Sequence, residues 1–267
     1  MRNMVLTTLC LVACGCGGGY TMTAPDQVAP AGGQAAVVVR LTRDEVRRVD
    51  VPVKKAGLEF RLRGEVVKAA FTDEDGFAEV AIAAPDAPGR YEVCVHHQDP
   101  EGDECRGEAL LYTWEPDRPA VAVELDELPG PSEPEVDAAV TALRGISEDA
   151  NIVYLTQEDI ADHADVRAWR DEAGYPDGPV LPWAKRRWRM TREGRLKLPR
   201  LRFDPRMIGP LAGLREVLPG LDAGVCLSEA AAKAFDGAGL AVFVVGDEDD
   251  LPEGARRTSW AELSGGL

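Results

Sequence analysis

The hydrophobic pattern changes period partway along the chain. Between residues 34 and 114, short apolar runs alternate with polar positions and are separated by turn residues. The clearest runs lie at 35–41, 58–62, 78–82, 91–95 and 109–112. In a strand, alternate side chains face opposite sides, so runs such as YEVCV at 91–95 suit a half-buried sheet. Several short strands at this spacing predict an antiparallel β-sandwich.

After Pro119 the apolar segments alternate between strand-like and helix-like periods. Strands are expected at 120–124, 151–155, 179–181, 222–226 and 240–245, and helices at 135–146, 165–173, 210–217 and 229–237. This alternation is typical of an α/β domain with a parallel sheet. The expected fold class is therefore a two-domain protein, with an N-terminal all-β sandwich (34–117) and a C-terminal α/β domain (118–267).

The first residues predict export from the cytoplasm. A charged start (1–3) and an apolar run (4–12) lead to the small residues of a cleavage site, so residues 1–13 are expected to be a signal peptide. The LVAC sequence at 11–14 resembles the lipobox of bacterial lipoproteins. That resemblance implies that Cys14 is lipid-modified, for example with palmitate, and that the protein is anchored to a membrane in the extracytoplasmic cell envelope. Cys16 fits the lipobox less well, and a plain signal peptide is the alternative. Residues 14–33 are interpreted as a flexible tether.

The net charge limits the classes of binding partner, and the cysteine content indicates the compartment. The net charge of -16 argues against nucleic acid, which requires a dominant positive field. Six cysteines suit an oxidising compartment. Cys94 and Cys105 flank a turn-rich segment and predict a hairpin disulfide, whereas Cys226 is expected to be a buried thiol.

Two features of the first domain can be mistaken for chemical sites. The segment 72–95 resembles bacterial immunoglobulin-like and carboxypeptidase-regulatory-type modules, in which a TDxDG turn precedes a strand. The same FTDEDG sequence looks like a nucleophile loop, but a strand follows it where an enzyme of that type needs a helix, which favours the turn. His96 and His97 are adjacent in a strand, so they point to opposite faces and are expected to be surface residues rather than a metal site.

The AVAVELDELPGPS sequence at 120–132 is a strand-like run followed by an acidic loop, and a second strand-like run at 151–155 ends at Thr156. In these features the second domain resembles the haloacid dehalogenase-like (HAD-like) superfamily, over nearly all of 120–267. Within it, residues 151–181 look most like lipin-type phosphatidate phosphatases. The resemblance implies a Rossmann-like three-layer fold. It places Glu124 at the family's nucleophile, Asp126 at the general acid, Thr156 at the phosphate-binding hydroxyl and Arg206 at the cation.

Departures from the family pattern predict that this chemistry is lost. Glu124 is one methylene longer than aspartate, and a displacement of that size can slow a reaction by about 10²-fold. The motif that should complete a Mg²⁺ shell reads GVCLSE at 224–229, with Glu229 as its only acid. The acidic GDEDD loop at 246–250 is an alternative metal site, but the short tail after it favours a solvated turn. We therefore expect no metal and no cofactor, with Mg²⁺ required only if phosphatase activity remains.

A basic segment at 185–202 lies inside this acidic protein, with Trp183 and Trp188 interleaved. Its candidate lipid- or phosphate-binding residues are Arg186, Arg187, Arg189, Arg192 and Arg195. On an anchored protein these cations suit phospholipid headgroups. The alternative is a solvated hairpin whose arginines pair with the protein's own carboxylates.

Three functions compete at this point. The favoured one is a non-catalytic, lipid-anchored module that binds a ligand, a lipid headgroup or an envelope protein. The second is an active phosphatase acting on a phospholipid or another phosphoester. The third is a purely structural envelope lipoprotein.

Overall fold

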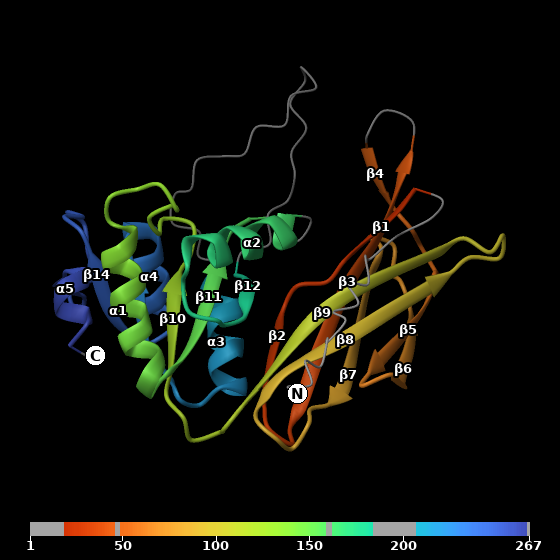
Figure 1. Cartoon of the computed structure of the whole chain (residues 1–267), viewed down its shortest axis with the longest axis horizontal. Helices are drawn as coiled ribbons and strands as arrows, with labels where there is room; N and C mark the ends of the chain where they lie inside the picture. Colours follow the sequence, from red (N-terminus) through yellow and green to blue (C-terminus); the bar gives the residue numbers. More distant parts are fainter. Residues whose placement is uncertain (1–18, 46–48, 159–161, 184–206, 266–267) are drawn as a thin grey trace, which may run out of the picture.

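The structure is a computed structural model that describes residues 19–45, 49–158, 162–183 and 207–265. A β-sandwich and an α/β domain lie side by side, joined by a short connection after β9 (Figure 1). The change from β-strands alone to alternating strands and helices comes after β9, near the change of hydrophobic period in the sequence.

The first domain consists of two packed sheets. One sheet contains β1 (Tyr20–Thr23), β3 (Gln34–Glu45), β4 (Val49–Pro52) and β7 (Phe77–Ala83), and β3 pairs antiparallel with the other three. The other sheet has the order β2 (Gln27–Pro30), β9 (Glu104–Trp114), β8 (Gly89–Gln98), β5 (Gly57–Leu62) and β6 (Glu65–Phe71). Its pairs are antiparallel except for β2 with β9. These two sheets form an immunoglobulin-like β-sandwich.

Alternation in the sequence produces the sandwich core. On β5, Leu58, Phe60 and Leu62 are buried while the residues between them face outward. Strand β8 buries Val93 and Val95 in the same way, and both are fully enclosed. The five predicted strands are all present, and the core side chains are the apolar ones that the pattern indicated.

The predicted tether is wrong for residues 20–33. Tyr20–Thr23 pairs with β3, and Gln27–Pro30 pairs with the end of β9, so both segments belong to the sandwich. Prolines and small residues make this stretch look like coil in isolation. Its strands have only four residues each, so partners distant in sequence must supply their stability.

The TDEDG segment is a turn, as expected. The Asp73 carboxylate accepts hydrogen bonds from the N–H groups of Asp75 (2.9 Å) and Phe77 (2.8 Å). Gly76 has a φ of 79°, which suits glycine, and β7 follows directly. Of the two histidines, His97 is buried rather than at the surface, with its Nδ1 2.9 Å from the Gly57 carbonyl oxygen.

The predicted Cys94–Cys105 disulfide is wrong. The β8–β9 register places Cys94 opposite Glu108 and places Cys105 opposite His97. Cys94 lies on the outer face, where its thiol donates a hydrogen bond to Glu92 at 2.7 Å, whereas Cys105 is fully buried and takes part in a different disulfide. Two side chains on opposite faces of a sheet cannot be bridged. Cys226 is a buried thiol, as predicted.

The second domain is built on one parallel sheet of six strands. Its order is β12 (Val180–Pro182), β11 (Asn151–Thr156), β10 (Ala120–Glu124), β13 (Leu221–Cys226), β14 (Ala241–Val245) and β15 (Arg256–Thr258). Numbered within the domain, this order is 3-2-1-4-5-6, that of a doubly wound sheet. The strand order reverses between β10 and β13.

Helices cover both faces of this sheet (Figure 1). The helices are α1 (Val136–Asp149), α2 (His163–Ala173), α3 (Ile208–Val217), α4 (Glu229–Gly237) and α5 (Trp260–Leu263). Because β10 is buried on both faces, its side chains alternate between two cores. Val121 and Val123 pack toward α1 and α5, and Ala120 and Ala122 pack toward α3 and α4.

The tail after the acidic loop differs from the prediction. It adds β15, which pairs with β14, and the short helix α5, whose Trp260 and Leu263 are buried. β15 has the sequence RRT, so no apolar run marks it as a strand. No helix of the described residues is long and apolar enough to cross a bilayer.

Candidate functional site

The candidate site lies at the carboxyl edge of the parallel sheet. Glu124 ends β10, Asp126 follows two residues later, and Thr156 ends β11. Ser228 lies just after β13, on the other side of β10. In doubly wound sheets ligands bind in the crevice outside the strand ends, where the order reverses. The three residues predicted from the acidic loop and from β11 are thus brought to this edge, and Ser228 joins them.

The Glu124 carboxylate lies buried at the point between β10 and β13 where the strand order reverses. Its side chain is 1% exposed, and one carboxylate oxygen accepts hydrogen bonds from the N–H groups of Leu227 (2.8 Å) and Ser228 (2.9 Å). The other oxygen accepts from the Ser228 hydroxyl at 2.5 Å. Ser228 also caps α4 by accepting from the Ala231 N–H. The carboxylate therefore joins the end of β10 to the start of α4, at the place where a ligand would enter.

Asp126 makes the corresponding connection toward β11. One of its oxygens accepts from the Thr156 hydroxyl at 2.5 Å, and the other accepts from the Gln157 N–H at 2.8 Å. The Thr156 hydroxyl in turn accepts from the Glu158 N–H at 3.1 Å. The two carboxylates are therefore directed to opposite neighbouring strands, Glu124 to β13 and Asp126 to β11.

Burial sets the protonation of Glu124. Desolvation raises its pKa from 4.5 to about 6, and the nearby Asp126 charge acts in the same direction. Hydrogen bonds from Ser228 and Leu227 favour the ionised form and limit the shift.

Stability is expected to depend on pH through this group. Because the folded pKa lies above the unfolded value, the contribution is fully present below about pH 4.5 and is lost as pH rises through about 6. The free energy of unfolding of the wild type, minus that of Glu124→Gln, should fall by about 2 kcal/mol across this window. Urea denaturation of both proteins at a series of pH values measures the difference, and a flat difference would contradict the raised pKa.

The acidic side chains of the altered motif and of the loop after β14 are largely exposed or paired with a cation. Within the described ranges, no group of three or more His, Cys, Asp and Glu side chains is arranged to hold a metal ion. The acidic loop after β14 is largely exposed, and Asp250 pairs with Lys233 at 2.7 Å. Lys233 also pairs with Glu229 at 2.5 Å, so the acid left in the altered motif is engaged with a cation.

Several predicted residues lie outside the described residues. They are the lipidation candidate Cys14, the family-cation candidate Arg206, and the basic-segment candidates Arg186, Arg187, Arg189, Arg192 and Arg195. Trp183, which borders the basic segment, is described and is not a surface residue. Its side chain is 1% exposed and packs against Phe235, with 5.4 Å between ring centroids.

A buried polar junction between the domains was not predicted. Asp26, between β1 and β2, is 0% exposed, and its carboxylate accepts from the Val180 N–H (3.0 Å) and from Arg167 (3.1 Å). The Asp26 N–H donates to Nε2 of His163 at 3.1 Å. Burial lowers the pKa of His163, which favours the neutral ring that can accept this bond. Asp26 thus connects the sandwich to α2 and β12, although nothing in its local sequence indicates this role.

A second set of polar contacts between the domains is centred on Asp177, which lies in the loop before β12. Its carboxylate accepts from the Tyr112 hydroxyl at 2.9 Å and from Arg90 at 3.2 Å, both on the sandwich. Arg170, which is 2% exposed, lies 3.4 Å from Asp177 and also donates to the Gly178 carbonyl. The domains are therefore joined by ion pairs and hydrogen bonds as well as by the connection between them.

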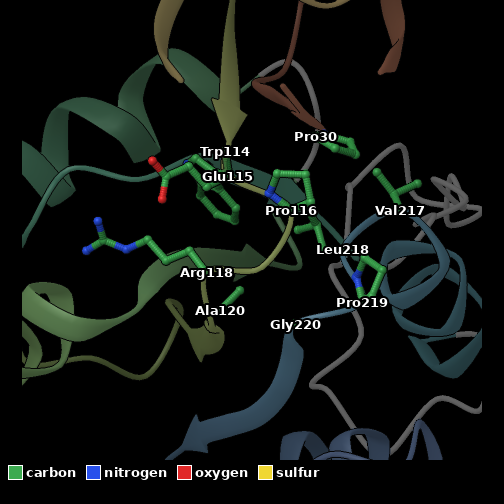
Figure 2. A pocket seen from close by; sticks show the side chains of 10 residues that line it. All are labelled: Pro30, Trp114, Glu115, Pro116, Arg118, Ala120, Val217, Leu218, Pro219 and Gly220. Atoms are coloured by element: carbon green, nitrogen blue, oxygen red, sulfur yellow. The ribbon is translucent and has the colours of Figure 1, made fainter. Parts of the chain in front are cut away.

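The junction between the domains is concave beside the segment that connects them. A groove of about 370 Å³ is lined by Arg90, Tyr112, Trp114, Arg118 and Asp177 among others. Figure 2 shows a smaller apolar hollow on the neighbouring side, where Trp114, Pro116, Val217 and Leu218 converge. Its volume of about 10 Å³ leaves room for about one water molecule.

Comparisons with known proteins support no family assignment. No protein-family model matches the chain, and a search of curated proteins finds no match. Among solved structures, the D00-D0 domain of intimin is 17% identical, with a TM-score of 0.26 over 36% of this chain, and the match covers 46% of that chain, about half its length. A bacterial immunoglobulin-like domain from the M. primoryensis ice-binding adhesin is 18% identical, with a TM-score of 0.24, over 37% of this chain and 97% of that one. PhoD is 9% identical, with a TM-score of 0.32, over 60% of this chain and 37% of that one. Such scores carry no argument, so the immunoglobulin-like assignment depends on the strand order described above.

Proposed function

We propose that this chain is a lipid-anchored, extracytoplasmic bacterial lipoprotein that binds a partner and does not catalyse a reaction. An immunoglobulin-like sandwich would present a degenerate HAD-like domain at the membrane surface. The lipobox-like LVAC sequence supports the anchor at Cys14. The doubly wound strand order is compatible with a HAD-like ancestry but is shared by many unrelated families.

The position of the Glu124 carboxylate carries the non-catalytic part of the proposal. A HAD-like nucleophile must present an oxygen to phosphorus and to Mg²⁺. Both oxygens of Glu124 instead accept hydrogen bonds from the β13–α4 loop, and the side chain is almost fully buried. Freeing it for attack would leave the donors of Leu227 and Ser228 unsatisfied, at a cost of about 1–3 kcal/mol for each.

One observation favours the phosphatase alternative. Asp126 and Thr156 lie at the edge of the sheet where phosphate would bind, and they are in direct contact at 2.5 Å. A carboxyl group beside a hydroxyl could take part in proton transfer. A phosphatase of this type would also need an exposed nucleophile and a set of metal ligands. Glu124 is buried, and the described residues include no such set of ligands.

A hydrolysis assay separates these two functions. The protein should not turn over a panel of phosphoesters that includes phosphatidate in the presence of Mg²⁺, and Glu124→Asp should not restore turnover. Mg²⁺-dependent hydrolysis by the wild type that disappears in Glu124→Gln would show that Glu124 is a working nucleophile and would overturn the non-catalytic proposal.

Vesicle binding distinguishes the binding module from a purely structural lipoprotein. Salt-sensitive binding to anionic phospholipid vesicles that is lost when Arg186 and Arg187 are changed to Glu would support headgroup recognition. Binding that is unaffected by these charge reversals would remove the basic segment from the proposed site.

A further inference from the structure

Cys105, on β9, is disulfide-bonded to a cysteine that precedes the described residues. Its side chain is fully buried in the sandwich core. The partner is not Cys94, which faces the other side of the sheet, nor Cys226, which is buried in the α/β domain. The other cysteines of the chain lie within residues 1–18: Cys10, Cys14 and Cys16.

The first described strand enters the sandwich beside Cys105. Met22 of β1 covers Gly107, since a Cβ added there would be 2.7 Å from the Met22 Cγ atom. Two residues earlier, the Tyr20 ring lies edge-on to the ring of His97, with 5.3 Å between the centroids. His97 is the residue opposite Cys105 in the β8–β9 register. Tyr20 therefore lies next to Cys105, at the end of β1 where the preceding residues join the sandwich.

Chain length allows Cys16 to reach Cys105. Cys16 is four residues before Tyr20, and four extended residues span at most about 14 Å. The Cα atoms of a disulfide are about 4.4–6.8 Å apart, which is well within this span. Cys10 and Cys14 are also within reach by length, so the choice among the three depends on how the chain is processed.

Lipoprotein processing selects one of these three cysteines. Cleavage before Cys14 removes Cys10 with the signal peptide, and lipid modification of Cys14 occupies its sulfur. Modification at Cys16 instead would remove both Cys10 and Cys14, and no cysteine before the described residues would then have a thiol for Cys105. The disulfide of Cys105 therefore also favours Cys14 over Cys16 as the lipidated residue.

We propose that Cys16 and Cys105 form a disulfide that holds the lipid anchor against the sandwich. This inference rests on the proposed lipoprotein function, because lipid at Cys14 is what selects Cys16. Cys14 and Cys16 are two residues apart, so at most about 7 Å of backbone separates the lipid attachment from the disulfide. The sandwich is then joined to the acyl chains through a short covalent link at β9, rather than through the flexible tether expected for residues 14–33.

The bond forms by oxidation outside the cytoplasm. The two thiols give up two protons and two electrons to the disulfide of an extracytoplasmic thiol oxidase, which leaves as a dithiol. Because Cys105 is buried in the folded sandwich, small thiols have little access to the bond once the protein has folded.

Peptide mapping of the exported full chain, purified from membranes and alkylated without reduction, tests the pairing. Cleavage after glutamate places Cys94 and Cys105 on separate peptides. We expect the Cys105 peptide to be linked to the N-terminal peptide through Cys16, with the mass of the lipid on Cys14. In Cys16→Ser the Cys105 thiol should be alkylated, whereas the matched control Cys94→Ser should keep the link.

Urea denaturation gives a second measurement. The bond closes a loop of about 90 residues, so Cys16→Ser should lower the urea midpoint by about 1 M. Cys94→Ser should leave the midpoint unchanged. Under reducing conditions the wild type and Cys16→Ser should unfold at the same urea concentration, and a difference that persists there would show that the serine acts by a route other than the disulfide.

The mapping outcomes separate this inference from the proposed function. Lipid on Cys14 with Cys16 and Cys105 both alkylated would overturn the inference alone. A Cys16–Cys105 link in a chain without lipid would support the disulfide and overturn the lipid anchor. A link from Cys105 to Cys14 or Cys10 would overturn both.

Discussion

Replacing Glu124 by alanine is expected to lower the free energy of unfolding by about 3–5 kcal/mol at pH 7. The substitution leaves the part-buried N–H groups of Leu227 and Ser228 without the acceptor they now have and opens a cavity where the carboxylate was. It also frees the Ser228 hydroxyl that caps α4. Urea denaturation followed by circular dichroism measures the loss.

Two variants serve as controls for this result. Glu124→Gln retains the volume and one acceptor oxygen, so it should cost less than the alanine substitution, about 1–2 kcal/mol. Glu127→Ala removes an exposed carboxylate from the same loop and should change stability by no more than about 0.5 kcal/mol. A Glu124→Ala protein as stable as Glu127→Ala would contradict the structural role assigned to this carboxylate.

Replacing Asp26 by alanine is expected to lower the free energy of unfolding by about 2–4 kcal/mol and to weaken the contact between the domains. The Val180 N–H would lose its acceptor inside the protein, and Arg167 would lose its ion-pair partner. Denaturation monitored separately by tryptophan fluorescence and circular dichroism should show transitions that no longer coincide, because the sandwich core and the core beneath α1 share no residue. A third core, which includes Val28 and Tyr112 of the sandwich, spans the two domains, so the separation should be partial.

Asp117→Ala is the matched control for the domain junction. Asp117 is an exposed aspartate in the connection between the domains, so its removal should leave the unfolding transition unchanged. Asp26→Asn should be intermediate, since its side-chain oxygen can still accept from Val180. If Asp26→Ala unfolds like the wild type, the buried carboxylate does not hold the domains together.

The folding of the candidate site could be predicted only in part. Glu124, Asp126 and Thr156 end or follow neighbouring parallel strands, so their meeting at one edge follows from the strand pattern alone. That Glu124 turns to Ser228 and Asp126 turns to Thr156 could not be predicted, because it depends on which strand lies on each side of β10.

Local periodicity determined most of the regular elements. The strands β10, β11, β13 and β14 and the helices α1 to α4 were recognisable because each is long enough to show a repeat of apolar residues. Segments of three or four residues, such as β1, β2 and β15, have no such repeat and form strands only because a partner strand is already in place.

The tertiary structure decided which polar groups are buried together. Asp26 and His163 are 137 residues apart. The residues next to each of them in the sequence do not indicate that it is buried. The Cys94–Cys105 prediction failed for the same kind of reason, since two cysteines that flank a turn look paired until the register assigns them to opposite faces. Sequence determines what a segment can form by itself, whereas partners, register and the cost of burying charge are properties of the assembled fold.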